Sequence, residues 1–319
     1  MTYPDKSICL LYTTYHSFLW DLISKEIDHK HLTVINFSKR PLNNSLKSKI
    51  IERTKTSKIN FIITCLAIAL KAKTSKYNLT LPHPDHLLGN TLFFNKNALS
   101  ITLLEDGILN YYHYKRAYAI AKKSEKRKKI TQLTPFKYNL YSGHLSGVDD
   151  CPTSELHGWF TDPEQIINKE KFKSTKKIQL PSSSTEIQES NNTVILLDQP
   201  LEKFLSAETA KAIREKAKNF IEKNFKEVII KPHPEHASTE EKIANEVSFS
   251  FEPNIPIEEV ILRIEPSAAI SFCSTALINI SKISSNTQCI AIGINEIVSE
   301  LPDTQQIKEL FLKNNIKIH

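Results

Sequence analysis

Glycine is scarce in this chain, with only six glycines among 319 residues. The sequence has neither the G-x-G-x-x-G pattern of dinucleotide-binding turns nor the glycine-rich P-loop of many nucleotide-binding enzymes. Both patterns need glycine because the backbone must approach a phosphate closely. A phosphate bound by this protein must therefore be held in another way.

Paired cysteines are also lacking, because the five cysteines are odd in number and far apart. None has the C-x-x-C spacing of a zinc site, and four lie beside apolar residues. We therefore expect no metal site and no disulfide, but reduced thiols in or near a core, as in cytosolic proteins. These cysteines are Cys9, Cys65, Cys151, Cys273 and Cys289.

Long apolar segments are absent as well. The longest apolar run, residues 61–70, is much shorter than the roughly 20 residues that cross a bilayer. The N-terminus has no basic segment followed by an apolar one and a small-residue cleavage site, so it does not resemble a signal peptide. We expect a cytoplasmic protein that does not span the membrane.

The net charge is +7, and much of the excess lies in residues 115–129, which contain eight Lys or Arg residues and one acid, Glu125. One interpretation is the solvated face of a helix. The other is a binding surface for an anionic partner, such as the inner face of the cytoplasmic membrane, an acidic glycolipid or nucleic acid. Nucleic acid is not expected, since the aromatic residues precede the basic run and no helix-turn-helix or zinc pattern occurs.

Short apolar runs alternate with helical patterns along the chain, which predicts parallel sheets of the doubly wound kind. In the first half we expect strands at 8–12, 32–37 and 100–104, an extended piece at 92–94, helices at 15–27 and 108–130, and a strand or helix at 61–70. In the second half we expect strands at 194–197, 227–230, 268–272 and 288–292, and helices at 207–224, 257–264, 275–283 and 304–314.

A polar segment rich in Lys, Ser, Thr, Gln and Asn, residues 171–192, is the predicted linker. It separates an N-terminal domain, 1–170, from a C-terminal domain, 193–319. The predicted fold class is α/β, with two Rossmann-like domains that face each other across a cleft.

An acidic motif follows the strand predicted at 100–104. The strand delivers Glu105 and Asp106 to a turn at the carboxyl edge of the sheet, where open α/β proteins bind ligands, and Gly107 permits the tight exit. One carboxylate can face a cleft while its neighbour turns toward the backbone. A desolvated carboxylate has a raised pKa and can act as general base toward a sugar hydroxyl. A purely structural acid pair is the alternative.

A proline-flanked histidine follows the strand predicted at 227–230. Pro232 and Pro234 restrict the backbone on both sides of His233, so the imidazole is held in place. A held imidazole at the end of a strand can donate to a leaving phosphate. The alternative is a histidine in a surface loop. A second His-Pro pair, His83-Pro84, has no strong strand before it, so the dipeptide alone is not a specific signal.

Two hydroxyl residues, Ser274 and Thr275, open the helix predicted at 275–283. A helix N-terminus presents free N–H groups that bind phosphate, and the hydroxyls add donors; ordinary N-capping is the alternative. Glu258 and Glu259 begin another helix, where they could accept hydrogen bonds from ribose hydroxyls or simply complement the helix dipole.

Taken together and in this order, these segments resemble bacterial sialyltransferases that share a D/E-D/E-G motif, a His-Pro motif and a later Ser/Thr pair. These include glycosyltransferase families 52 and 38, the lipooligosaccharide sialyltransferases and the capsular polysialyltransferases. The sequences EDGILNYY at 105–112 and KPHPE at 231–235 are similar to that group, as is the turn at 12–16. The resemblance implies a GT-B fold, a CMP-sialic acid donor, inversion at the anomeric carbon, and no metal or other cofactor.

The resemblance also implies roles for single residues. Asp106 would be the general base, His233 would stabilise the leaving CMP phosphate, and Ser274 and Thr275 would bind that phosphate. Glu258 would hold the cytidine ribose, with the register open by one residue to Glu259. The other residues expected to bind substrate are Glu105, Gly107, Lys231, Pro234, Thr14 and Tyr15.

We therefore expect transfer of sialic acid to an acceptor sugar of a bacterial surface glycan, such as a lipid-linked lipooligosaccharide or capsule chain. The family 52 resemblance implies a homodimer. A first alternative keeps the fold but changes the donor to another CMP-activated sugar, namely Kdo, legionaminic acid or pseudaminic acid. A second is a non-catalytic basic protein that binds nucleic acid or membrane through residues 115–129.

Overall fold

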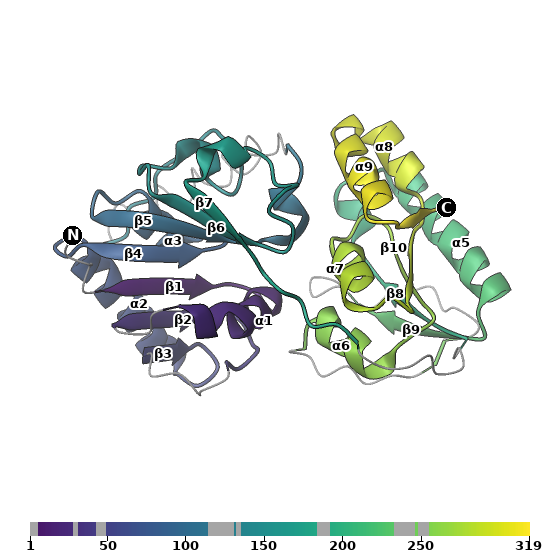
Figure 1. Cartoon of the computed structure of the whole chain (residues 1–319), viewed down its shortest axis with the longest axis horizontal. Helices are drawn as coiled ribbons and strands as arrows, with labels where there is room; N and C mark the ends of the chain where they lie inside the picture. The colour runs from purple at the N-terminus through teal and green to yellow at the C-terminus, as the bar shows by residue number, and fades with distance from the viewer. Residues whose placement is uncertain are drawn as a thin grey trace. The chain divides into compact units, whose positions relative to one another are not determined.

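The computed structural model describes residues 6–27, 31–42, 49–113, 131, 135–183, 192–232, 246–247 and 255–319. The chain forms two compact units, Met1–Gln179 and Leu180–His319 (Figure 1). Each unit contains one sheet in which all described strand pairs are parallel.

The sheet of the first unit has seven strands in the order β3-β2-β1-β4-β5-β6-β7. The strand order reverses between β1 and β4, and this topological switch point is where the carboxyl ends of the strands open a crevice. The strands are β1 Ser7–Leu11, β2 Leu32–Asn36, β3 Lys49–Glu52, β4 Tyr77–Leu81, β5 Ala98–Leu104, β6 Leu156–Phe160 and β7 Ser174–Lys177.

The α-helices described in the first unit are α1 Thr14–Ile23, α2 Lys58–Ala72 and α3 Leu87–Phe93. Four short 3-10 helices accompany them: η1 Ser24–Glu26, η2 Gly107–Asn110, η3 Val148–Asp150 and η4 Lys169–Lys171. A capping box begins α1, in which Thr13 and His16 satisfy each other's backbone N–H groups. Ser57 caps α2 through the N–H of Asn60, so the ambiguous apolar run at 61–70 is a helix.

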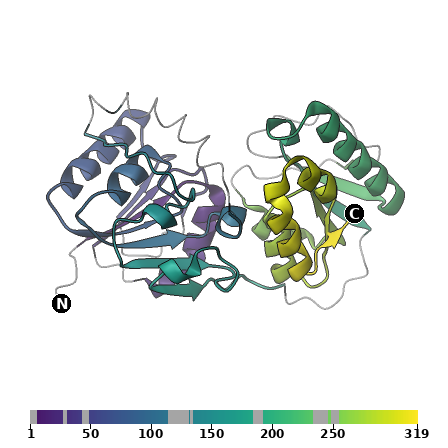
Figure 2. The same cartoon turned by 90° about the horizontal axis from the view of Figure 1, so that it is seen from above.

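The sheet of the second unit has five strands in the order β12-β11-β10-β8-β9, so its switch point lies between β8 and β10. Figure 1 and Figure 2 show α5 on one side of this sheet and α6 and α7 on the other, as in a doubly wound fold. The strands are β8 Thr193–Leu197, β9 Glu227–Lys231, β10 Ala268–Ser271, β11 Gln288–Ala291 and β12 Lys317–Ile318. The helices are η5 Leu201–Lys203, α5 Ala207–Asn224, α6 Ile257–Ile264, α7 Ala276–Ile283, α8 Ile294–Glu300, η6 Pro302–Thr304 and α9 Gln305–Lys313.

Three of the predicted segments differ from the structure. Residues 92–94 are not an extended piece, because α3 occupies residues up to Phe93. The helix predicted at 108–130 does not begin as an α-helix, since η2 ends at Asn110 and the chain then bends; residues 114–130, which include the basic run, lie outside the described residues. Strand β7 lies within the segment predicted as a linker and extends the first sheet to Lys177.

All five cysteines are free, and Cys9, Cys65 and Cys289 are buried. Burial raises the pKa of the Cys65 thiol to about 11 and that of Cys289 to about 12. None of the helices in the described ranges is long and apolar enough to cross a membrane.

Candidate active site

The acidic motif follows β5, beside the topological switch point between β1 and β4 of the first unit. Strand β5 ends at Leu104, and Glu105 and Asp106 follow directly. Gly107 then has a φ of 64°, a left-handed conformation that glycine adopts without strain. Because the strands are parallel, the loops that follow β1, β4 and β6 begin at the same carboxyl edge of the sheet as this motif.

Glu105 is completely buried and its carboxylate is surrounded by donors. The Tyr15 hydroxyl donates to Oε1 at 2.7 Å, and the Thr161 hydroxyl donates to the same oxygen at 3.2 Å. Oε2 accepts a hydrogen bond from the Thr161 backbone N–H at 2.5 Å and another from the Tyr111 hydroxyl. Burial and the charge of Glu105 raise the pKa of Tyr111 well above its usual range, which keeps the phenol protonated as a donor. Glu105 therefore ties α1, η2 and the end of β6 together.

Asp106 has a different environment. Its Oδ1 is 2.9 Å from Nε2 of His16, whereas its Oδ2 is 3.7 Å from Nε2 of His83, which is too long for a hydrogen bond. Its backbone N–H donates to Oδ1 of Asn110 at 2.6 Å. The side chain is 18% exposed, and no described residue forms a hydrogen bond with Oδ2. One oxygen is thus held and the other is open.

Backbone contacts determine how the two histidines face this carboxylate. Nδ1 of His16 accepts the Thr13 N–H at 3.2 Å, so the ring proton lies on Nε2 and is donated to Asp106. Nδ1 of His83 accepts the Asp85 N–H at 3.1 Å, which likewise leaves Nε2–H directed toward Asp106. Both rings therefore direct Nε2–H toward the carboxylate.

The pKa of Asp106 is lowered, although the sequence argument predicted a raised value. Burial acts to raise this pKa, as expected. The neighbouring His83 and the hydrogen bond and charge of His16, with a smaller contribution from His144, together outweigh burial. Asp106 is therefore ionised over the whole physiological pH range.

The ring of Tyr12 packs against His83 and the nearby His86. Tyr12 stacks on His86, with ring centroids 5.0 Å apart, and tilts against His83 at 4.9 Å. The Tyr12 hydroxyl is buried without a hydrogen-bond partner among the described residues. It lies so close to Gly89 that an added Cβ there would come within 2.1 Å of it. The packing holds His83 in its position beside Asp106.

His16, His83 and His144 were not among the predicted site residues. His16 lies in the turn at 12–16 that carried the family resemblance, next to the predicted Thr14 and Tyr15. His83 was discounted because no strand was recognised before it, and this was wrong, since β4 ends two residues earlier at Leu81. The alternation of apolar and polar residues in YNLTL, Tyr77–Leu81, is the sequence signal that could have identified it.

The hydroxyl motif of the second unit lies at a topological switch point. Oε1 of Gln199, which follows β8, accepts the Ser271 hydroxyl at 3.1 Å and the Cys273 backbone N–H at 2.8 Å. These bonds fix the loop that leads from β10 to α7. The Ser274 hydroxyl accepts the Ala276 N–H at 3.2 Å, so it caps the start of α7. Thr275 is the N-cap residue of that helix.

Three other predicted residues lie in the same unit. Glu258, in the first turn of α6, is buried and accepts a hydrogen bond from Nδ2 of Asn279 at 2.8 Å, whereas Glu259 is half-buried. Burial lowers the pKa of Lys231 at the end of β9, and the charge of Glu258 partly opposes this effect. His233 and Pro234 lie outside the described residues.

Metal ligands do not gather in the part of the chain that the structure describes. No group of three or more His, Cys, Asp or Glu side chains there could hold a metal ion.

The solved structures that are similar to this chain include two transferases. One is the alpha/beta-galactoside alpha-2,3-sialyltransferase of Photobacterium phosphoreum, a luminous marine bacterium, with a TM-score of 0.50 and 12% identity over 98% of both chains. The other, the glycotransferase of kitacinnamycin, has a TM-score of 0.49 and 8% identity over 100% of this chain and 87% of that one. No curated protein sequence matches the chain. The Photobacterium match and the two parallel sheets confirm the predicted α/β fold of the GT-B type.

A protein-family model identifies the family of this chain. The model of the alpha-2,8-polysialyltransferases matches residues 3–292, which is most of the 319-residue chain. This match confirms the predicted resemblance and the predicted enzyme class. The chain belongs to the alpha-2,8-polysialyltransferase family and is a glycosyltransferase.

Proposed function

We propose that this protein transfers sialic acid from CMP-sialic acid to a hydroxyl of an acceptor glycan, with inversion at the anomeric carbon and Asp106 as general base. The observation that carries the proposal is the carboxylate of Asp106 beside the switch point of the first unit. One of its oxygens is held by His16 at 2.9 Å, and the other makes no hydrogen bond among the described residues.

The geometry of Asp106 supports a single displacement. The acceptor hydroxyl donates to Oδ2, and its oxygen attacks the anomeric carbon while the carboxylate takes the proton. The bond from that carbon to the CMP phosphate breaks, and CMP leaves with the bonding electron pair. The hydrogen bond from His16 restricts rotation of the carboxylate, and the lowered pKa keeps it ionised.

The motifs of the second unit are proposed to bind the donor. His233 would donate to the phosphate as its charge develops, and the Ser274 and Thr275 hydroxyls and the start of α7 would add donors. Glu258 or Glu259 would accept hydrogen bonds from the ribose. The bonds of Gln199 to the β10–α7 loop support this role, because they hold the phosphate-binding segment before the donor arrives.

The acceptor is proposed to be a lipid-linked surface glycan, lipooligosaccharide or capsule, reached from the inner face of the cytoplasmic membrane. The basic run at 115–129 would contact anionic lipid, and a homodimer is part of the same proposal. A non-catalytic nucleic-acid or membrane adaptor is set aside because the chain is a glycosyltransferase.

Product analysis tests the proposal. The purified protein is incubated with CMP-sialic acid and a panel of galactosides and sialosides in the presence of EDTA, since the proposed reaction needs no metal. Parallel reactions contain CMP-Kdo, CMP-legionaminic acid or CMP-pseudaminic acid. We expect a sialylated product by mass spectrometry with wild-type protein, and roughly 10²–10⁴-fold less of it with Asp106→Asn. Transfer from only one of the other donors would show that its sugar, rather than sialic acid, is the one transferred. Turnover that requires added metal would refute the metal-free mechanism.

A further inference from the structure

Helix α2, Lys58–Ala72, carries an apolar stripe on its outer face. Ile59, Ile62, Ile63 and Leu70 are between 47% and 71% exposed. They are four of the six large hydrophobic side chains that are exposed among the described residues. Their spacing of three, four and seven residues places them on one side of the helix.

The stripe plays no part in the core of the unit. The buried residues of α2 are Phe61, Cys65, Ala69 and Ala72, which form a separate face of the helix. The core of the unit therefore forms without the four side chains of the stripe. A contiguous exposed apolar surface of this kind marks a site of interaction.

Positive charge lies at both ends of the stripe. Residues 49–76 contain seven Lys or Arg residues and one acid, Glu52. That acid is buried and is neutralised by Lys55 at 2.5 Å. The seven basic residues are all exposed: Lys49, Arg53, Lys55 and Lys58 before or at the start of α2, and Lys71, Lys73 and Lys76 at or beyond its end.

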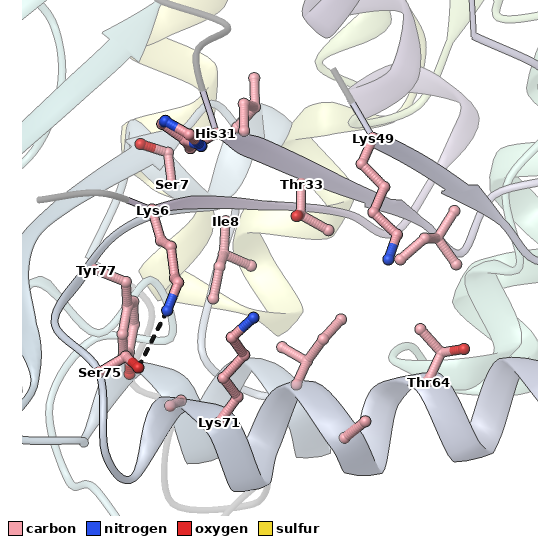
Figure 3. Close-up of a pocket in the computed structure, with 15 residues that line it drawn as sticks. Lys6, Ser7, Ile8, His31, Thr33, Lys49, Thr64, Lys71, Ser75 and Tyr77 are labelled. Carbon is pink, nitrogen blue, oxygen red and sulfur yellow. Dashed lines mark hydrogen bonds between the residues drawn. The ribbon is translucent and has the colours of Figure 1, made fainter.

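A basic pocket of about 920 Å³ adjoins the same helix. It lies between α2 and the first residues of β1 to β4, and Figure 3 shows the amino groups of Lys6, Lys49 and Lys71 pointing into it. Lys6 donates to the Ser75 hydroxyl at 3.2 Å. No Asp or Glu occurs among its described lining residues, and no described ion pair involves any of these three lysines.

This pocket is separate from the acidic motif. Its residues begin the strands, whereas Asp106 follows the end of β5, so the two lie at opposite edges of one parallel sheet. Five-residue strands such as β1 put about 17 Å between the edges. A ligand in the pocket would leave the proposed catalytic carboxylate accessible.

We propose that α2 and this pocket form a docking surface for an anionic lipid bilayer. The stripe would enter the boundary between headgroups and acyl chains, as interfacial amphipathic helices do. The basic residues at its ends would contact lipid phosphates, and the pocket would take the headgroup of an anionic lipid.

Charge complementarity favours a bilayer over other occupants. Two copies of this surface facing each other would bring their basic rims together, and nucleic acid would leave the apolar stripe exposed to water. The inference goes beyond the proposed reaction, because lipid binding needs neither donor nor acceptor. It also rests on residues other than 115–129.

Vesicle flotation of the full chain tests the proposal. Phosphatidylcholine vesicles with and without phosphatidylglycerol are compared at low and high salt. We expect the wild type to float with the anionic vesicles, and more weakly at high salt because salt screens the lysines. The double variant Ile59→Asn/Ile63→Asn should reduce the bound fraction about tenfold. Lys49→Gln/Lys71→Gln should reduce binding to anionic vesicles and weaken its salt dependence.

Matched controls come from the second unit. Leu312 is 56% exposed on α9, and Lys211 is exposed on α5, so Leu312→Asn and Lys211→Gln should bind vesicles like the wild type. All variants should transfer to a soluble acceptor as the wild type does. This readout separates a failed docking surface from a failed transfer reaction.

Two results would overturn the docking surface. One is equal flotation of the stripe variant and the wild type. The other is a dimer in light scattering that the stripe variant converts to monomer while flotation is unchanged, since the stripe would then be an interface between copies. If the double variant does not fold, Ile59→Trp replaces it, and its fluorescence must shift to the blue with anionic vesicles but not with neutral ones.

Discussion

The neighbouring carboxylates of the acidic motif have opposite environments. Glu105 is fully buried and receives four hydrogen bonds from three residues, whereas Asp106 is 18% exposed and its carboxylate receives one. Both residues follow the end of β5, where the chain turns into η2, and this turn directs their side chains to different sides. A saturated carboxylate stabilises the fold, and one with an open oxygen can take a proton. The comparison therefore assigns structure to Glu105 and chemistry to Asp106.

The largest expected effect tests the chemical half of this comparison. Asp106→Asn keeps the shape of the side chain but removes the proton acceptor, so transfer should fall by roughly 10²–10⁴-fold. CMP affinity by isothermal titration should change little, because the residue serves the acceptor. Near wild-type turnover of the purified variant would remove Asp106 from the mechanism.

A second substitution separates the acceptor side from the donor side. His233→Ala should reduce transfer by about 10²-fold, since it removes a donor to the developing phosphate charge. Unlike Asp106→Asn, it should also weaken CMP binding or slow donor hydrolysis, and both can be measured without an acceptor. Unchanged CMP affinity together with unchanged hydrolysis would contradict the proposed role.

Glu105→Gln tests the structural half. The amide cannot accept from all the donors that surround Glu105, so we expect a loss of about 1–3 kcal/mol in the free energy of unfolding. Transfer per folded molecule should fall much less than in Asp106→Asn. Thermal denaturation and kinetics on the same preparation provide the two values. Normal stability with abolished transfer would exchange the two roles.

Much of the fold could be predicted from local patterns. The boundaries of α5, Ala207–Asn224, agree with the prediction because Ser206 caps the helix and its apolar face repeats with helical spacing. Strand β4 was missed because its polar and apolar residues alternate over only five positions. Helix α2 was ambiguous because the outer stripe makes it apolar on more than its core face.

The site shows where local patterns are insufficient. The different orientations of the Glu105 and Asp106 carboxylates were predicted, but the environment that lowers the Asp106 pKa was not. His16 is 90 residues from Asp106 in sequence and reaches it only through the order of the strands. The bend after η2 is another tertiary effect, because the Tyr111 hydroxyl turns back to Glu105.

The smallest expected effect concerns the histidine beside Asp106. In the wild type the pKa of Asp106 is lowered, so the carboxylate should become protonated only below the ordinary aspartate pKa of about 3.9. His83→Asn removes the largest influence that lowers this pKa. The carboxylate should then protonate at higher pH, and the acid limb of kcat/KM should move upward, while the rate at neutral pH changes little because Asp106 is ionised in both proteins. His157→Asn provides the matched control, since this histidine lies near Glu155 rather than Asp106. An acid limb that stays in place in His83→Asn, or that moves equally in both variants, would show that His83 does not set the protonation of the proposed base.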